Sequence, residues 1–272
     1  MKTEPAPLFT PPGIIYSRYA SRHIETDQCV AVHGLTYLLA GSLRVTEAGH
    51  RRVFEAGSLL FTRKNFLANF TKYPAATGPF RAITIVFDPA TLLAARLRTA
   101  WAGKVAPASD PAVAALAPTP ALLQFGESLQ PYFEQPLPAP LAAQQQQQAL
   151  MLLLQAHPGL QPVLFHFAPP GKIDLEPFMR QHFRFNVDLR QLAYLSGRSL
   201  ASFKRDFHRL FRTSPSRWRY QQRLAEAYYL LQEEHQRPSE VYHEVGFESL
   251  AHFSHAFKQL FGLPPSRVYT PH

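Results

Sequence analysis

The chain has 272 residues, enough for one large or two modest domains, and its 28 Lys and Arg outnumber its 19 Asp and Glu, a formal net charge of +9. A content of 46% hydrophobic and 17% charged residues excludes a disordered chain, and the longest apolar run, residues 150–154, is far shorter than the ~18 residues that cross a bilayer. The basic balance favours a polyanionic partner such as nucleic acid.

The amino-terminal residues and the cysteine content bear on the compartment. Prolines and mixed charges fill the first thirty residues, without the apolar stretch of a secretory signal, so no leader is expected. Cys29 is the sole cysteine, which excludes a disulfide within the chain and a thiolate zinc cage. We therefore expect a cytoplasmic protein that does not act at a membrane.

Residues 30–87 have the pattern of short β-strands. Apolar side chains fall at every second position in several runs, as in Leu35, Tyr37 and Leu39, and glycines separate these runs. Many short strands at regular spacing predict an antiparallel sandwich or barrel.

Three helices are expected next, over residues 91–101, 120–133 and 140–157. The third contains five glutamines at 144–148, which we interpret as a solvated stretch of good helix formers. Its leucine-rich end, residues 149–154, needs an apolar partner. That partner is either the strand-rich domain or the same helix of a second subunit, so a homodimer is one expectation.

Prolines and glycines crowd residues 158–171, and the residue before each proline is driven away from helical conformation. We place a linker at residues 161–171. It separates a first domain, residues 1–160, from a second domain, residues 172–272, whose pattern is almost wholly helical.

An internal repeat is the strongest signal in the sequence. An offset of fifty residues aligns residues 199–217 with residues 249–267, and ten of the nineteen positions are identical. Each copy begins with a serine suited to a helix N-cap and continues with apolar residues at helical spacing. In the first copy these are Phe203, Phe207, Leu210 and Phe211, a stripe that we expect to be buried against neighbouring helices.

A shorter helix is expected before each copy, over residues 188–196 and 238–245, followed by Gly197 and Gly246. A short helix, a turn with glycine and a second helix capped by serine form the helix-turn-helix layout, whose second helix lies in the DNA major groove. Residues 216–234 are expected to form a long helix that joins the two units.

The local charge agrees with a DNA-binding surface. Residues 189–219 hold eight Lys and Arg and one acidic residue, Asp206. Such clustering suits the neutralisation of phosphates. A charge run by itself more often marks a solvated helix face, so the prediction of DNA binding depends on its coincidence with the repeat and the turn glycines.

Together these motifs resemble the AraC/XylS family of transcription regulators, whose DNA-binding region has two helix-turn-helix units joined by a long helix. The resemblance covers residues 172–272 and is most specific at the sequence VGFES, residues 245–249. At two positions the chain departs from the family, which often has arginine where this chain has His255 and a small residue where it has Tyr242. These departures predict weaker or pH-sensitive base contacts from the second unit and an adjusted helix packing.

The resemblance implies a sequence-specific transcription regulator, expected as an activator, whose two recognition helices enter successive major grooves of double-stranded DNA. RNA polymerase is then a candidate partner. An unknown small-molecule or protein effector would act on the first domain. The candidates for DNA contact are Ala201, Ser202, Lys204, Arg205, His208, Arg209 and Arg212 in the first unit, and Leu250, Ala251, His252, Ser254, His255 and Lys258 in the second.

The expected fold therefore has two parts. The first is an α+β domain, which in this family is commonly a cupin-like β-barrel followed by helices and serves as a sensor or holds a dimer together. The second is an all-α domain with two helix-turn-helix units joined by a long helix.

Two other function classes stay open at this point. A cupin-type metalloenzyme would need paired His-x-His ligands, but His23, His33 and His50 stand alone, and Cys29 is expected to be an inert small hydrophobe. We therefore expect no enzyme activity, no metal and no cofactor. A non-specific nucleic-acid-binding protein is the other alternative, which the repeated helix pattern and the lack of RNA-stacking motifs disfavour.

Overall fold

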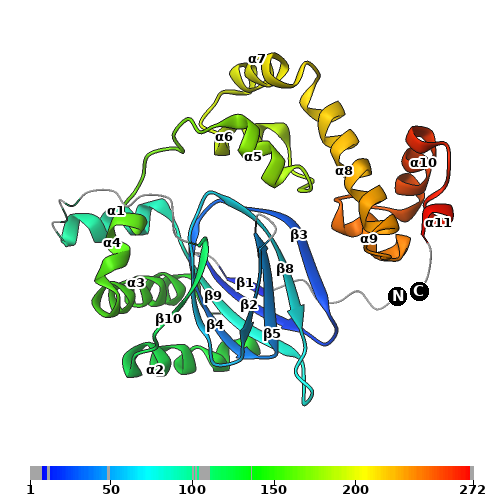
Figure 1. The fold of residues 1–272 in the computed structure, drawn as a ribbon. Helices are drawn as coiled ribbons and strands as arrows, with labels where there is room; N and C mark the ends of the chain where they lie inside the picture. Colours follow the sequence, from blue (N-terminus) through cyan, green and yellow to red (C-terminus); the bar gives the residue numbers. More distant parts are fainter. Residues whose placement is uncertain are drawn as a thin grey trace. The chain divides into compact units, whose positions relative to one another are not determined.

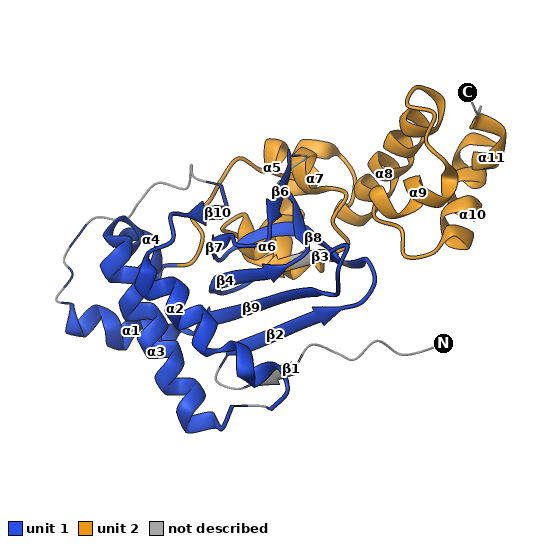
Figure 2. Cartoon of the chain, turned by 90° about the horizontal axis from the view of Figure 1, so that it is seen from below, with its two compact units in different colours: residues 1–25, 30–168 blue, residues 26–29, 169–272 orange. Residues whose placement is uncertain are grey.

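The computed structural model describes residues 8–10, 13–47, 50–99, 101, 103, 111–135 and 137–269. It divides the chain into two compact units, residues 1–25 with 30–168 and residues 26–29 with 169–272 (Figure 2). The first unit combines strands with helices, and the second consists of helices apart from its short share of β3 (Figure 1). The expected fold class, an α+β part followed by an all-α part with two helix-turn-helix units, is confirmed, while the cupin type of the first part stays a prediction.

The strands of the first unit form two sheets. The six-stranded sheet has the order β1 (Leu8–Thr10), β2 (Ile14–Tyr19), β9 (Phe80–Phe87), β4 (His33–Ala40), β7 (Leu59–Thr62) and β10 (Val113–Leu116). The four-stranded sheet has the order β3 (His23–Val30), β8 (Phe66–Tyr73), β5 (Ser42–Glu47) and β6 (His50–Glu55). The strand pattern predicted from residue 30 onward therefore missed β1, β2, most of β3 and also β10, which is defined by its antiparallel pairing with β7 rather than by its own alternation.

The six-stranded sheet is covered on both faces. Tyr16, Ile83 and Tyr37 lie in one row across β2, β9 and β4, and they pack in one core cluster with residues of the helices. The alternate position Leu38 points to the other face, where it shares a second cluster with Val45 of the four-stranded sheet. The first unit therefore has three layers, with helices, the six-stranded sheet and the four-stranded sheet in that order.

The predicted helices of the first unit are present with shifted ends. They are α1 (Pro89–Arg98), α2 (Pro120–Ser128) and α3 (Ala139–Ala156). The predicted helix over 120–133 ends early, because Pro131 has no N–H to donate within an α-helix, and a separate 3-10 turn, η1 (Gln130–Phe133), follows.

Two expectations for α3 are resolved by its packing. Gln146, inside the glutamine tract predicted to be solvated, is buried, donates from Nε2 to the Val86 carbonyl and accepts from Thr91 Oγ1 at 3.2 Å. At the leucine-rich end, Leu150 and Leu153 are buried in the core cluster of the sheet. This is the first of the two partners predicted for that end, and the homodimer stays a prediction.

The segment predicted as a linker begins inside folded structure. Residues 158–164 form η2 (Pro158–Leu160) and α4 (Gln161–Leu164), and Leu164 and Phe165 are buried in the core of the first unit. The apolar area that these side chains remove from water stabilises a short helix in a proline-rich stretch where local propensity disfavours one.

The second unit contains the repeated motif as expected. Its helices are α5 (Leu175–His182), α6 (Leu189–Leu195), α7 (Leu200–Phe211), α8 (Pro215–Gln232), α9 (Pro238–Glu244), α10 (Leu250–Phe261) and α11 (Pro265–Val268). The two short helices before the repeated ones, α6 and α9, and the joining helix α8 lie within two residues of their predicted bounds. The helix α5 had no predicted bounds.

Candidate nucleic-acid interface

The two repeated helices, α7 and α10, begin in the same way. Ser199 is the N-cap of α7, and its Oγ accepts a hydrogen bond from the Ser202 N–H at 3.2 Å. Ser249 is the N-cap of α10, and its Oγ accepts from the His252 N–H at 3.2 Å. Both predicted serine caps are confirmed, and each satisfies an N–H that the first turn of a helix leaves without a partner.

Each turn before these helices requires its glycine. Gly197 has φ of 69° and Gly246 has φ of 85°, in the left-handed region that side chains disfavour. A Cβ on Gly197 would overlap the backbone of Gly171, and a Cβ on Gly246 would overlap the Arg184 carbonyl oxygen. The turns therefore depend on glycine for both conformation and close packing.

The aromatic stripe of α7 faces the protein interior. Phe203 and Phe207 are fully buried, and Phe207 and Phe211 both pack against Trp218 of α8, with ring centroids 5.7 and 4.7 Å away. The prediction that Leu210 belongs to this buried stripe is wrong, because Leu210 is 47% exposed. Trp218 covers the side of the stripe that carries the phenylalanines, which leaves the leucine at its margin in solvent.

The opposite face holds the candidate residues. The Arg205 side chain is 78% exposed. His255, where the family often has arginine, is exposed at the equivalent position of α10. Leu250 is 40% exposed, so its side chain is accessible on this face and is not part of the buried core. The other candidates are exposed (Ala201, Lys204, His208, Arg209, Arg212, Ala251, His252 and Lys258) or half-buried (Ser202 and Ser254).

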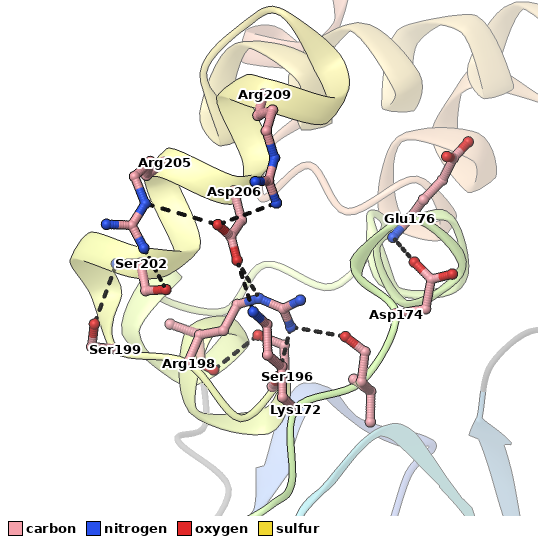
Figure 3. Close-up of polar contacts among 12 residues, drawn as sticks. Lys172, Asp174, Glu176, Ser196, Arg198, Ser199, Ser202, Arg205, Asp206 and Arg209 are labelled. Carbon is pink, nitrogen blue, oxygen red and sulfur yellow. Dashed lines mark hydrogen bonds and ion pairs between the residues drawn. The ribbon is translucent and has the colours of Figure 1, made fainter.

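A buried carboxylate lies beneath this face (Figure 3). Asp206 of α7 accepts a hydrogen bond from Arg198 Nε at 3.2 Å and forms ion pairs with Lys172 at 3.6 Å and with Arg209 at 3.6 Å. The Arg205 guanidinium lies farther away, at 3.9 Å. The Arg198 hydrogen bond is the main reason why the pKa of Asp206 is below its ordinary value, and the nearby cations lower it further.

Two of the cations counted toward DNA binding have structural roles instead. Besides binding Asp206, Arg198 donates from Nη1 to the carbonyls of Ile173, at 2.9 Å, and Ser196, at 2.7 Å. Arg219 is also buried and donates to backbone carbonyls of the loop before α6. A count of cations along the sequence does not show this division of roles. The available signal was Asp206 itself, a carboxylate three residues after Phe203 on the buried side of the helix.

One of the three isolated histidines of the strand-rich unit, His33, is buried. His33 is 1% exposed, its Nδ1 accepts from the Lys64 N–H at 3.3 Å, and its Nε2 has no partner within the described part of the chain. Burial lowers its pKa to about 3, with smaller contributions from Lys64, Arg63 and His166. His33 is therefore buried with one of its two ring nitrogens hydrogen-bonded.

Metal ligation and thiol reactivity both depend on which side chains the fold brings together. Among the described residues, no group of three or more His, Cys, Asp or Glu side chains is placed to hold a metal ion. Cys29 is half-buried, and burial raises the pKa of its thiol, away from the reactive thiolate. Within the described residues, no helix combines the length and apolar character that crossing a bilayer requires.

Comparisons with known proteins agree with this geometry. Residues 192–270, which include α7, α8 and α10, match a family model described as a helix-turn-helix domain. The transcriptional regulator ExsA of Pseudomonas aeruginosa is 26% identical over 240 residues, 86% of this chain and 84% of that protein. An uncharacterised helix-turn-helix regulator of Haemophilus influenzae is 38% identical over 79 residues, 29% of this chain and 26% of that protein.

Among solved structures, an apo form of ToxT from Vibrio cholerae superimposes with a TM-score of 0.47 at 10% identity, over 97% of this chain and 100% of that chain. A regulator from Chromobacterium violaceum described as having an AraC-type DNA-binding domain superimposes with a TM-score of 0.32 at 25% identity, over 35% of this chain and 85% of that chain.

Proposed function

We propose that the chain is a transcriptional regulator of the AraC/XylS type, and that α7 and α10 read successive major grooves of one DNA duplex. The helix-turn-helix match over residues 192–270 and the similarity to a transcriptional regulator over most of the chain support this proposal. The observation that carries this proposal is the equivalence of the two exposed helix faces. At an offset of fifty residues, Arg205 corresponds to His255 and His208 to Lys258, and all four side chains are exposed. Two accessible polar faces of the same design suit two similar surfaces on one partner.

The side chains differ in what they offer to DNA. The Arg205 guanidinium can donate two hydrogen bonds to O6 and N7 of guanine, and the Ala201 methyl can contact the methyl group of thymine. Lys204, Arg209 and Arg212 supply charge for the phosphates. We therefore assign base and phosphate contacts in the first groove to Ala201, Ser202, Lys204, Arg205, His208, Arg209 and Arg212.

The second groove receives a less cationic set. Lys258 is the sole Lys or Arg side chain among its candidates, and His252, Ser254 and His255 offer hydrogen bonds instead of a permanent charge. Leu250 and Ala251 offer apolar contact to thymine methyl groups. We therefore expect the second helix-turn-helix to contribute selectivity more than affinity, through Leu250, Ala251, His252, Ser254, His255 and Lys258.

Selection of bound sequences from a random duplex pool tests this function directly. The full chain is expected to enrich a site with two half-sites one helical turn apart. Arg205→Ala should lose base preference in one half-site only, and His255→Ala should lose it in the other. Gln221→Ala, on the exposed side of α8, is the matched control and should select the parent sequence. Enrichment of no sequence at all would favour the alternative, a non-specific nucleic-acid-binding protein.

We also propose that binding activates transcription through contact with RNA polymerase, as the resemblance to the family implies. A reporter gene placed downstream of the selected site, transcribed in vitro by purified RNA polymerase, provides the test. Added protein should raise the transcript level, and the Arg205→Ala variant should not. A fall in transcript would instead assign the chain as a repressor.

The strand-rich unit, residues 1–25 with 30–168, is proposed to receive the effector. Support comes from buried polar atoms on the helix-covered face of the six-stranded sheet, where Tyr16 Oη, Tyr37 Oη and His33 Nε2 have no partner within the described residues. Buried polar groups are costly unless they are satisfied, and a small molecule could satisfy them. A ligand screen by thermal unfolding, repeated with Tyr37→Phe, tests this. A compound that stabilises both proteins equally binds elsewhere.

The homodimer is tested separately by light scattering of the full chain at micromolar concentration. A monomer mass at every concentration would contradict it.

A further inference from the structure

The two helix-turn-helix units are joined by more than the α8 helix. Arg223, on α8, reaches carbonyls on both units at once. Its Nε donates to Phe183 at 2.9 Å and its Nη2 to Phe185 at 2.8 Å, both in the loop that leads into α6 of the first unit. Its Nη1 donates to Gly246 at 3.0 Å, in the turn of the second unit.

Other contacts connect the same two segments. Asn186 Nδ2, in the loop of the first unit, donates to Glu248 Oε1 in the second unit at 2.6 Å. Arg184 forms an ion pair with Glu226 of α8. The backbone at Gly246 also approaches the Arg184 carbonyl so closely that no side chain fits there. Residues 183–187 and 246–248 therefore form one packed contact between the units, which we call the bridge.

The bridge has a mechanical consequence for α7 and α10. A single helix such as α8 fixes the distance between the elements at its ends, but it leaves their relative tilt to the contacts beside it. Gly246 and Glu248 lie immediately before Ser249, the N-cap of α10. A contact at this point therefore sets the direction in which α10 leaves its turn, relative to the first unit.

We propose that Arg223 is a positioning residue that sets the geometry between α7 and α10, and so the half-site spacing that the protein accepts. This inference rests on the proposed function, in which both helices enter one duplex. Arginine suits the role because its planar guanidinium presents five donors in fixed directions and can hold three carbonyls at once. Lysine carries its charge at one point and cannot span the same three acceptors.

A distance measurement without DNA tests the structural half of this proposal. In a Cys29→Ser background, spin labels are placed at Leu210→Cys and Leu260→Cys, which are equivalent, exposed positions of α7 and α10, 47% and 45% exposed. Pulsed electron spin resonance should give one narrow distance distribution for the parent. Arg223→Lys should broaden or shift it, and Gln221→Ala, also on α8, should not. An unchanged distribution in Arg223→Lys overturns the proposal.

Binding to spacing variants of the selected duplex tests the functional half. The parent should lose about tenfold or more in affinity when one base pair is inserted between the half-sites, since this moves a whole half-site out of register. Arg223→Lys should bind both duplexes within about twofold of each other. Its affinity for a duplex with a scrambled second half-site should equal that of the parent. Equal weakening on all duplexes would mean a general folding defect and would overturn the positioning role.

The distance measurement and the duplex-binding measurement together distinguish failure of this inference from failure of the proposed function on which it rests. If the parent shows no spacing preference but Arg223→Lys broadens the distance distribution, DNA reading by two grooves fails while the bridge stands. If Arg223→Lys does not fold, Asn186→Ala replaces it, because its side chain is exposed and it removes one contact across the bridge. Parent-like distances and spacing preference in that variant would then overturn the proposal.

Discussion

Arginines only a few residues apart in the first helix-turn-helix have different physical roles. Arg205 is exposed on α7 and is proposed to contact a base, whereas the Arg198 side chain is buried between Asp206 and two carbonyls. The charge count alone treats them as equal. Substitution should separate them, because one contributes to binding and the other to the fold.

Arg205→Ala is expected to weaken binding to the selected duplex by roughly 1–3 kcal/mol and to relax one base position. Its free energy of unfolding should stay that of the parent, since the side chain is exposed. Arg198→Ala should instead lower the free energy of unfolding by about 1–3 kcal/mol, because the carbonyls of Ile173 and Ser196 lose a charged donor. Fluorescence anisotropy and urea unfolding measure the two effects. Equal losses of DNA affinity without loss of stability would contradict the division of roles.

The burial of His33 predicts that the stability of the strand-rich unit depends on pH. The folded protein keeps this histidine neutral down to about pH 3, whereas the unfolded chain protonates it near pH 6.5. Protons therefore bind the unfolded state preferentially below about pH 6.5, and this contribution to stability is lost as the pH falls. The loss should be about 2 kcal/mol at pH 5.

Urea unfolding at pH 7 and pH 5 measures this dependence. His33→Gln should show a smaller loss between the two pH values than the parent, whatever its stability at pH 7. The exposed His50→Gln is the matched control and should lose as much as the parent. A parent and a His33→Gln variant with equal pH dependence would show that His33 is not the group responsible.

At the scale of elements, three glycines with positive φ separate conformational strain from packing. Gly246 has φ of 85° and lies against the Arg184 backbone, while Gly262, the C-cap of α10, has φ of 77° with open space around its Cα. Gly262→Ala should therefore cost about 1 kcal/mol of stability, the strain alone. Gly246→Ala should cost more, since the neighbouring backbone must also move, and Gly197→Ala should behave in the same way.

The repeat provides a reciprocal test at the end of α7. Arg212 occupies there the position that Gly262 occupies in α10, with φ of 54°. Arg212→Gly is therefore expected to stabilise the isolated protein by about 1 kcal/mol while weakening DNA binding. Thermal unfolding of these glycine and arginine variants gives the order. A Gly246→Ala protein as stable as Gly262→Ala would mean that packing at the turn does not matter.

At the scale of the whole molecule, charge divides unevenly between the two helix-turn-helix units. Residues 172–219 hold eleven Lys and Arg against four Asp and Glu, whereas residues 220–272 hold four against six. Phosphate contacts should therefore come mainly from the first unit. Each contact adds about 0.9 to the slope of log affinity against log salt, so that slope reports where they lie.

A duplex that covers only the first half-site should retain most of the salt dependence of the full site. A duplex that covers only the second half-site should show a shallow one, because the second unit releases few counterions. Anisotropy titrations between about 50 and 200 mM salt make the comparison. Equal slopes on the two short duplexes would contradict the assignment of affinity to the first unit.

Much of the helical unit follows from the sequence, because the signals for its helices and turns are local. Serine caps, helical spacing of phenylalanines and turn glycines act within a few residues, and the repeat shows each signal twice. They were sufficient to predict α6 to α10 and the exposed face of α7 and α10. In the strand-rich unit, the alternation of apolar residues in β4, β5 and β9 was similarly clear.

The remaining features depend on contacts between residues far apart in the chain. β10 is a strand because it pairs with β7, Gln146 is buried because α3 packs on the sheet, and Leu210 is exposed because Trp218 covers only the phenylalanines beside it. The roles of Arg198 and Arg223 were likewise decided by which carbonyls the fold brings near them. Sequence specifies which side chains a helix presents on each face. Only the packed structure determines what each face meets, since burial and hydrogen-bond partners are properties of neighbours in space.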